Sequence, residues 1–333
     1  MARTYDIDGT LAQVGAYAGI AVQGDGPLSS AADLLRRADI ALEGARTARA
    51  ARPLWFDDSM ERALIAQSEL EHAMRLGLEH DQFHPVFEPQ VDLITGRIIG
   101  FEVLARWRHP TCGIIGPDCF IPIAEHIGVI GRLSEQIIVT ALRAARGWDP
   151  SITLSVNISP SQLNDPWLAQ RMLALLTQAG FPAERLVVEI TEGSLFSDME
   201  LARSMLANLK NQGVRLALDD FGTGYSSLSH LRSLPLDVIK IDRSFVSSVC
   251  SDHESAAIVK AVCALAGAIG VPITAEGIED AETHAAVLAF GAHTGQGWYF
   301  GKPMNAEQAG ELLMRDAGEK FRLASPDLGR NAA

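Results

Sequence analysis

The segment that most constrains the fold of this chain is residues 216–228, which reads LALDDFGTGYSSL. An apolar stretch typical of a short buried strand ends in two adjacent carboxylates, Asp219 and Asp220, and a loop rich in glycine and serine follows. Because burying charge is costly, this pair indicates water, a cation or a substrate beside the strand end. The loop glycines allow close approach to a ligand and movement. The segment therefore predicts a metal site at the mouth of an α/β barrel.

The length and charge of the chain limit the classes of function. At 333 residues, with 47% hydrophobic and 21% charged residues, it can hold one large globular domain or two smaller ones. The formal net charge of −13 argues against DNA, RNA or anionic membranes as partners, because no basic patch is available to neutralise phosphates. A phosphate-ester substrate would need cations supplied by bound metal.

Neither targeting segments nor cysteine motifs are evident. We find no signal peptide and no apolar run approaching the ~20 residues of a membrane span. We therefore expect a cytoplasmic location without membrane contact, while the parent protein could carry upstream sensory or membrane segments. The cysteines show no CxxC spacing and no histidine partners at zinc-site distances, which favours free thiols. They are Cys112, Cys119, Cys250 and Cys263.

The chain divides into four parts. Residues 1–57 predict a short leader, with a strand near 16–22, a turn at 24–27 and a helix capped by Ser29 or Ser30. Residues 58–80 have the apolar spacing of one amphipathic helix, within a connecting segment 58–82 that either packs on the next domain or relays an upstream signal. Residues 83–318 form the main domain, and 319–333 a polar tail.

The main domain alternates short apolar strands with helices, which predicts a parallel sheet. About eight such units over some 240 residues fit a (β/α)8 barrel. A doubly wound open sheet is the alternative, but it would place a glycine-rich phosphate loop after the first strand, where residues 87–90 read FEPQ. The expected strands are 86–87, 98–105, 152–156, 186–190, 214–218, 238–241, 273–275 and 293–296. The expected helices are 133–145, 168–179, 199–212, 254–269 and 280–290.

Polar side chains recur where these strands end, which is where barrels of this type place their active sites. Each one alone could be a solvated surface group, and Lys240 could be a surface lysine. Their recurrence at equivalent places in successive units indicates a shared site instead. The set comprises Glu102, Asn157, Glu189, Glu192, Asp219, Asp220, Lys240, Glu276 and Gln296.

Oxygen donors without a His/Cys cluster suit hard cations such as Mg²⁺ or Mn²⁺. The carboxylates are more numerous than one Mg²⁺ normally takes from a protein, which points to two ions. Two metals about 4 Å apart can activate water and stabilise both oxygens of a phosphodiester under attack. Phosphodiester hydrolysis is therefore favoured. A barrel enzyme in which Lys240 abstracts a proton from a carboxylate substrate is the alternative, and it leaves the Asp pair and the loop unexplained.

Residues 83–318 resemble an EAL domain, the cyclic di-GMP-specific phosphodiesterase family. The matching motifs, in order, are EVLARW (102–107), FIPIAE (120–125), VNIS (156–159), EITE (189–192), DDFGTGYSSL (219–228), IKID (239–242), AEGIE (275–279) and QGWYF (296–300). In the leader, residues 32–42 (ADLLRRADIAL) resemble the carboxyl-terminal end of a GGDEF (diguanylate cyclase) domain. The glycine-rich signature and metal aspartates of that family are absent, so we expect a remnant without cyclase activity.

The EAL resemblance implies a modified TIM barrel with one antiparallel strand, a homodimer formed through the barrel, two Mg²⁺ or Mn²⁺ ions, and hydrolysis of cyclic di-GMP to linear pGpG. It also implies that some residues bind the metals, that a lysine activates water and that other residues contact the substrate phosphate. A loop held by supporting residues would couple metal occupancy to dimerisation. The implied metal ligands are Glu102, Asn157, Glu189, Asp219 and Asp220. Lys240, Glu276 and Glu102 would be catalytic, Arg106, Glu88 and Gln296 would bind substrate, and Glu192, Glu279, Phe221, Gly222, Thr223, Gly224 and Ser226 would support or form the loop.

Two positions depart from the family pattern. Val103 replaces the alanine of the signature, and alternation along a strand points it away from Glu102, so we expect a packing change only. Glu88 stands where members often have glutamine, and its carboxylate would either accept from guanine N–H groups or repel phosphate. A catalytically silent cyclic di-GMP receptor is the competing function. Silent members typically lose metal ligands, and none is missing here.

Overall fold

The computed structural model describes residues 3–7, 10–23, 30–48, 50–196, 199–222 and 234–318. The chain divides into two compact units, Met1–Leu76 and Gly77–Ala333. The predicted turn at 24–27, the tail 319–333, and the loop residues Thr223, Gly224 and Ser226 lie outside the described residues.

The first unit contains an antiparallel pair, β1 (Arg3–Ile7) and β2 (Thr10–Val14), and a parallel pair, β3 (Gly19–Ile20) and β4 (Leu54–Trp55). Helix α1 (Ala31–Thr47) lies between β3 and β4 in sequence and begins at the Ser30 cap, whose side chain accepts from the Asp33 backbone N–H at 3.1 Å. Gly19 lies so close to α1 that an added Cβ would stand 2.2 Å from backbone atoms of that helix. The leader helix and its cap are confirmed, whereas the expected strand shrinks to two residues. Helix α2 (Asp58–Glu79) confirms the amphipathic helix.

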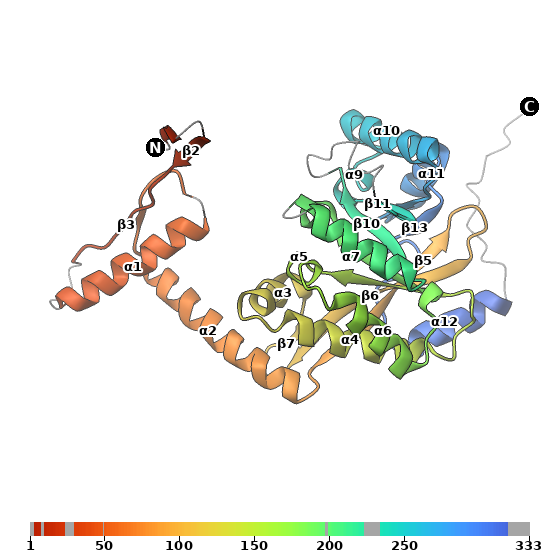
Figure 1. The fold of residues 1–333 in the computed structure, drawn as a ribbon, viewed down its shortest axis with the longest axis horizontal. Helices are drawn as coiled ribbons and strands as arrows, with labels where there is room; N and C mark the ends of the chain where they lie inside the picture. The colour runs from red at the N-terminus through yellow and green to blue at the C-terminus, as the bar shows by residue number, and fades with distance from the viewer. Residues whose placement is uncertain are drawn as a thin grey trace, which may run out of the picture. The chain divides into compact units, whose positions relative to one another are not determined.

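The second unit is a closed barrel (Figure 1). Strand β5 pairs antiparallel with both β6 and β13, which closes the sheet, and the other seven barrel strands run parallel to one another. A ninth strand, β7 (Gly113–Ile115), extends the β6 edge. The predicted barrel with one antiparallel strand is thus confirmed, and the open sheet is excluded. The barrel strands are β5 (Phe83–Asp92), β6 (Ile98–His109), β8 (Thr153–Ile158), β9 (Leu186–Thr191), β10 (Arg215–Phe221), β11 (Val238–Ile241), β12 (Ile273–Ala275) and β13 (Thr294–Gln296).

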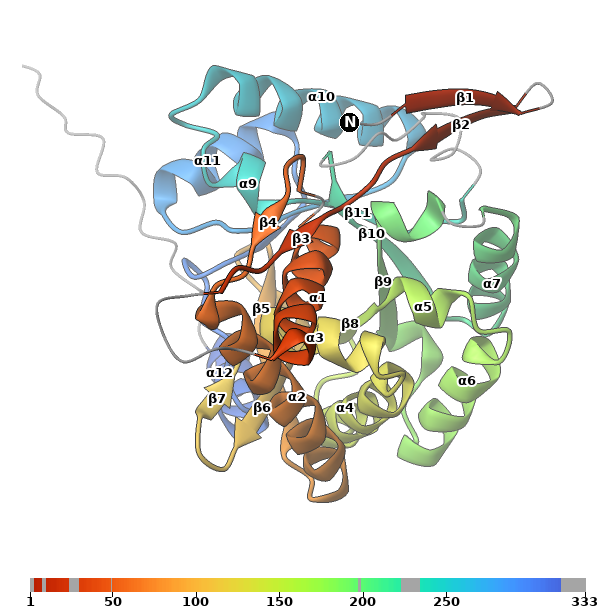
Figure 2. The same cartoon turned by 90° about the vertical axis from the view of Figure 1, so that its left-hand side faces the viewer.

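Helices surround the barrel strands (Figure 2), and all five expected helices of this unit are present. Of the helices in the described ranges, none combines the length and apolar character needed to cross a bilayer. Sequence periodicity missed α3, which contains Pro122, and α12 after the last strand. The helical segments are α3 (Pro117–His126), α4 (Ile130–Ala145), α5 (Pro160–Leu163), α6 (Leu168–Ala179), η1 (Ala183–Arg185), η2 (Glu192–Phe196), α7 (Met199–Asn211), α9 (Arg243–Val246), α10 (His253–Ile269), α11 (Ala281–Phe290) and α12 (Ala306–Gly318).

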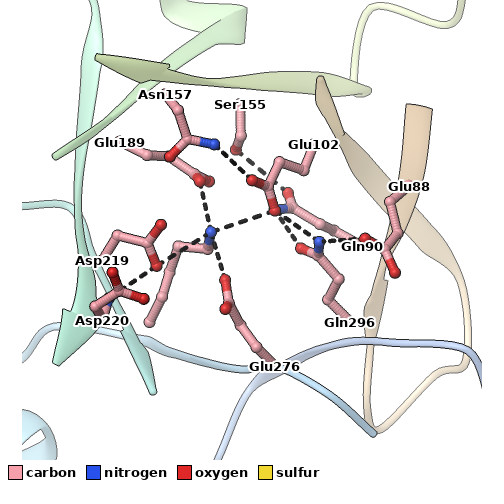
Figure 3. Close-up of polar contacts among 11 residues, drawn as sticks. Glu88, Gln90, Glu102, Ser155, Asn157, Glu189, Asp219, Asp220, Glu276 and Gln296 are labelled. Carbon is pink, nitrogen blue, oxygen red and sulfur yellow. Dashed lines mark hydrogen bonds and ion pairs between the residues drawn. The ribbon is translucent and has the colours of Figure 1, made fainter. Parts of the chain in front are cut away.

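Strand alternation sorts side chains between the barrel interior and the helix-facing shell. Val103 lines an apolar space together with Leu133 and Ile137 of α4, so it points away from the barrel interior. The expectation that Val103 affects packing only agrees with this placement. Its neighbour Glu102 points inward, where the polar residues of the other strands also converge (Figure 3).

Candidate active site

Four carboxylates point toward one another at the carboxyl ends of the parallel strands (Figure 3). Glu102 comes from β6, Glu189 from β9 and Asp219 from β10, and Glu276 directly follows β12. Ladder pairing places Asn157 of β8 opposite Glu189. Residues far apart in sequence therefore meet because parallel strands present their ends on one side of the barrel.

Lys240 of β11 lies at the centre of these carboxylates. Its Nζ is 2.5 Å from both Glu189 and Glu276, and 3.4 Å from both Glu102 and Asp219. The side chain is only 1% exposed, so the alternative of a surface lysine is wrong. Burial lowers the pKa of this amine, but the surrounding carboxylates outweigh burial and raise the pKa well above its usual value. Lys240 is therefore a buried amine whose carboxylate neighbours favour its charged form.

Amide side chains hold Glu102 from the other side. Asn157 Nδ2 and Gln296 Nε2 donate to its two oxygens, each at 2.6 Å. Gln296 Nε2 also lies 3.1 Å from Glu88, and Gln296 Oε1 accepts from Gln90 Nε2 at 3.1 Å. Burial raises the pKa of Glu102, but Lys240 and the amide donors together bring it below its usual value. Glu102 is thus stabilised as an anion by Lys240 and the two amide donors.

If all of them were ionised, the remaining carboxylates would carry more negative charge than one lysine neutralises, and their pKa values are raised accordingly. Burial, reinforced by Glu102 and Asp219, raises the pKa of Glu189 to about 8 despite Lys240. Burial also raises the pKa of Glu276 well above its usual value. At the end of β10, burial and the neighbouring Asp219 raise the pKa of Asp220 to about 6. A site with this charge balance favours an additional cation.

In the part of the chain that the structure describes, no group of three or more His, Cys, Asp or Glu side chains forms a ready metal cage. Lys240 accounts for this, because its ammonium lies among the oxygens that would otherwise converge on one point. The donor set still fits a hard cation, since it consists of carboxylate and amide oxygens without thiolate or imidazole. The raised pKa values of Glu189 and Asp220 agree with a site that lacks positive charge.

The carboxylate pair marks a change of backbone direction. Asp220 has a left-handed φ of +55°, and its N–H donates to Asp219 Oδ1 at 2.9 Å. Buried Phe221 ends the strand, and Gly222 follows at φ +104°. The Gly222 N–H donates to Glu192 Oε2 at 3.4 Å, and Glu192 is 2% exposed. Glu192 therefore contacts the start of the loop, and its role as a supporting residue stays a prediction.

The other predicted residues, Arg106 and Glu279, lie outside the carboxylate cluster. Arg106 is partly buried, donates to the Ala105 carbonyl at 2.9 Å, and is near enough to Glu88 for their charges to interact. Glu279 is exposed, and among the described residues it makes no hydrogen bond or ion pair with the cluster. Sequence reasoning missed Gln90, which is 7% exposed and bonds to Gln296. The alternating pattern of the first barrel strand is the feature that would have found it.

A mostly apolar cavity of about 370 Å³ lies beside the cluster. Asn157 and Thr191 border it on the cluster side, and Leu104, Pro117 and Ile121 contribute apolar surface. Its size and apolar walls with a few polar groups are typical of a pocket for a small organic ligand.

The family model for the EAL domain matches residues 68–303. This chain belongs to the EAL domain family. It is 38% identical over 309 residues to the uncharacterized protein y4lL of Sinorhizobium fredii, covering 93% of this chain and 37% of that protein. It is 34% identical over 263 residues to the cyclic di-GMP phosphodiesterase PA2567 of Pseudomonas aeruginosa, covering 78% of this chain and 44% of that protein.

A second relative from Pseudomonas aeruginosa is the bifunctional diguanylate cyclase/cyclic di-GMP phosphodiesterase MucR, 33% identical over 313 residues, with 92% of this chain and 45% of that protein covered. The chain thus spans less than half the length of these curated relatives. Among solved structures, the PaMucR phosphodiesterase in complex with c-di-GMP matches with a TM-score of 0.70 and 35% identity, covering 72% of this chain and 99% of that chain.

Proposed function

We propose that this chain is a metal-dependent phosphodiesterase that hydrolyses cyclic di-GMP to linear pGpG. The observation that carries the proposal is the convergence of Glu102, Glu189, Asp219 and Glu276 on buried Lys240 at the carboxyl end of the barrel. The likeness to phosphodiesterases of the same family supports the choice of substrate. The apolar cavity beside Asn157 supports a ligand that carries flat, apolar bases.

Two Mg²⁺ or Mn²⁺ ions would be held by Glu102, Asn157, Glu189, Asp219 and Asp220. When bound, such ions lower the pKa of water and neutralise charge on the reacting phosphate. The support from this structure is the donor chemistry and the excess of negative charge around a single lysine.

The chain's own residues have separate tasks. The charged Lys240 orients the attacking water and offsets negative charge next to the phosphate, which its position between Glu189 and Glu276 allows. Asn157 and Gln296 fix the orientation of Glu102 by donating to both of its oxygens. Arg106 is the one predicted phosphate contact, and its planar fork suits that geometry.

The test is to incubate purified protein with cyclic di-GMP and Mg²⁺ or Mn²⁺ and to follow pGpG by chromatography, with EDTA-treated protein as control. We expect product only with the divalent cation. Tight binding measured by calorimetry without product under either metal would contradict the proposal and establish the silent receptor. Turnover of a carboxylic acid in place of cyclic di-GMP would establish the proton-abstracting enzyme.

We propose in addition that residues 1–57 are a GGDEF-like remnant, joined through 58–82 to the catalytic domain at 83–318. In support, the alignment with the bifunctional relative covers 92% of this chain, which is more than the EAL match at 68–303. The β3–α1–β4 arrangement also supports a fragment of an α/β domain. Homodimerisation through the barrel and a cytoplasmic location stay predictions. Light scattering across protein concentration, run together with the hydrolysis assay, tests the dimer and its link to activity.

A further inference from the structure

A second cavity lies inside the barrel, on the amino-terminal side of the carboxylate cluster. Its volume is about 220 Å³, and both Lys240 and Glu189 line it. Other lining residues begin the parallel strands or adjoin their first residues, and most are partly exposed. These are Ile99, Thr153, Arg215, Val238, Pro272 and Thr294. The cavity therefore opens at the amino-terminal mouth of the barrel, opposite the end where the carboxylates meet.

Strand alternation connects this mouth to the cluster. Side chains two residues further along each strand also line the cavity, because alternate residues face the same side. The pairs are Thr153 and Ser155, Arg215 and Ala217, Val238 and Lys240, and Pro272 and Thr274. Barrels of this type normally fill this level with bulky branched side chains. Here small and hydroxyl-bearing side chains stand in their place, and the space that they leave reaches Lys240 and Glu189, each of which is 1% exposed.

The walls of the cavity carry buried polar groups that suit water. Ser155, Thr274 and Gln90 are 2%, 4% and 7% exposed. Ser155 Oγ lies 3.5 Å from Gln90 Oε1, and Gln90 bonds in turn to Gln296, which donates to Glu102. A cavity with polar groups on its walls needs only ~10–15 Å³ of such volume to hold one water molecule, so this one has room for several. A chain of hydrogen bonds thus runs from Ser155 through Gln90 and Gln296 to Glu102 of the cluster.

We propose that this cavity is a water passage, which connects solvent at the amino-terminal mouth of the barrel with the inner side of Lys240 and Glu189. Resting on the proposed function, its role is to keep the cluster hydrated while a bound dinucleotide covers the carboxyl end. Hydrolysis consumes one water for each bond cleaved, and the passage supplies it from the side that the substrate leaves open.

Cysteine accessibility tests the passage without any need for activity. In a background with Cys112, Cys119 and Cys250 changed to serine, Thr294→Cys probes the mouth and Thr274→Cys the interior. Methyl methanethiosulfonate labelling is followed by mass spectrometry, and each rate is divided by that of the same thiol in urea-unfolded protein. We expect Thr274→Cys to react at least about tenfold faster than native Cys263, which is 6% exposed, and cyclic di-GMP added without metal to leave this rate unchanged. A rate equal to that of Cys263, or protection by the nucleotide, overturns the passage.

Filling the space tests its role in turnover. Ala217 lines the cavity, so Ala217→Leu extends a side chain into it, and Ala217→Ser is the size-matched control. We expect Ala217→Leu to slow labelling of Thr274→Cys and to lower kcat about fivefold at unchanged KM. Thr294→Leu narrows the mouth and repeats the test if Ala217→Leu melts early. If a variant that fills the cavity keeps the kcat of the wild-type protein, the proposed role in hydration is overturned. If the wild-type protein itself yields no pGpG, the proposed function fails while the labelling rates still decide whether the passage exists.

Discussion

The two faces of the same barrel strands are equally buried and chemically opposite. Facing inward, Glu102, Glu189, Asp219 and Lys240 are between 1% and 7% exposed. Their chain neighbours Val103, Val188, Leu218 and Ile239, which face the helices, are between 0% and 5% exposed. Burial of the outward side chains stabilises the fold, whereas the inward ones lose hydration and replace it with ion pairs to one another and with hydrogen bonds from Asn157 and Gln296. Stability and chemistry are therefore carried by alternate residues of one strand.

This separation predicts that adjacent substitutions have different consequences. A buried ion pair contributes little net stability compared with an apolar pair, but removing one partner leaves an uncompensated charge. Inward substitutions should therefore change turnover and metal binding as well as stability, whereas outward substitutions should change the free energy of unfolding alone. Each variant below is paired with a counterpart on the other face or on the surface for that reason.

The largest effect is expected for Glu102→Ala. This change removes a proposed metal ligand and the acceptor of both Asn157 and Gln296, so kcat should fall on the order of 10³-fold, with loss of divalent-cation binding by calorimetry. The matched control is Val188→Ala on the helix-facing side of β9, which lines neither cavity and should keep its kcat within about twofold. Equal loss of turnover in both variants would show that the faces are not separate.

Ile239→Ala tests the outward face next to Lys240. Ile239 is 0% exposed, so truncation should lower the free energy of unfolding by about 3 kcal/mol, through lost burial and a residual cavity. Urea unfolding followed by circular dichroism measures this change. Turnover per folded molecule should be that of the wild type, and a large drop in kcat without destabilisation would contradict the comparison.

Lys240→Ala removes the cation at the centre of the cluster. We expect kcat to fall about 10²-fold, because the charged amine no longer orients water or offsets charge near the phosphate. Divalent-cation affinity should be kept or increased, since every proposed ligand is retained and a competing positive charge is removed. The exposed Lys260→Ala is the surface control. A fully active Lys240→Ala variant would remove the lysine from the mechanism.

The sequence predicted the barrel and most of the cluster because strand alternation and strand ends are local properties. It missed Gln90 because β5 runs antiparallel, so residues of the site lie along that strand and not at its carboxyl end. The backbone turns at Gly277 (φ +73°) and leaves Glu279 exposed, a placement that the sequence did not predict, while its supporting role stays a prediction. A Cβ at Gly277 would stand 2.6 Å from the Arg243 side chain, which is a tertiary contact that no local pattern contains.

Local sequence patterns also could not predict the central position of Lys240 or the second cavity, on the amino-terminal side of the cluster. A lysine between two isoleucines reads equally well as a surface residue, and only closure of the barrel brings four carboxylates around it. The second cavity depends on the summed volumes of side chains from several strands. Ala217 and Thr274 each fit a buried strand by themselves, and the space they leave together exists only in the assembled barrel.

The smallest effect is expected for Glu88→Gln, on the inward face of the antiparallel strand. Burial raises the pKa of Glu88, and the hydrogen bond from Gln296 together with the charge of Arg106 acts in the opposite direction. Glutamine keeps an acceptor for Gln296 and removes a charge that competes for Arg106 and repels phosphate. We therefore expect KM for cyclic di-GMP to fall about threefold, with kcat within about twofold. Glu88→Ala, which also removes the acceptor, separates charge from hydrogen bonding. A rise in KM for Glu88→Gln would assign the carboxylate to guanine N–H groups instead of to repulsion.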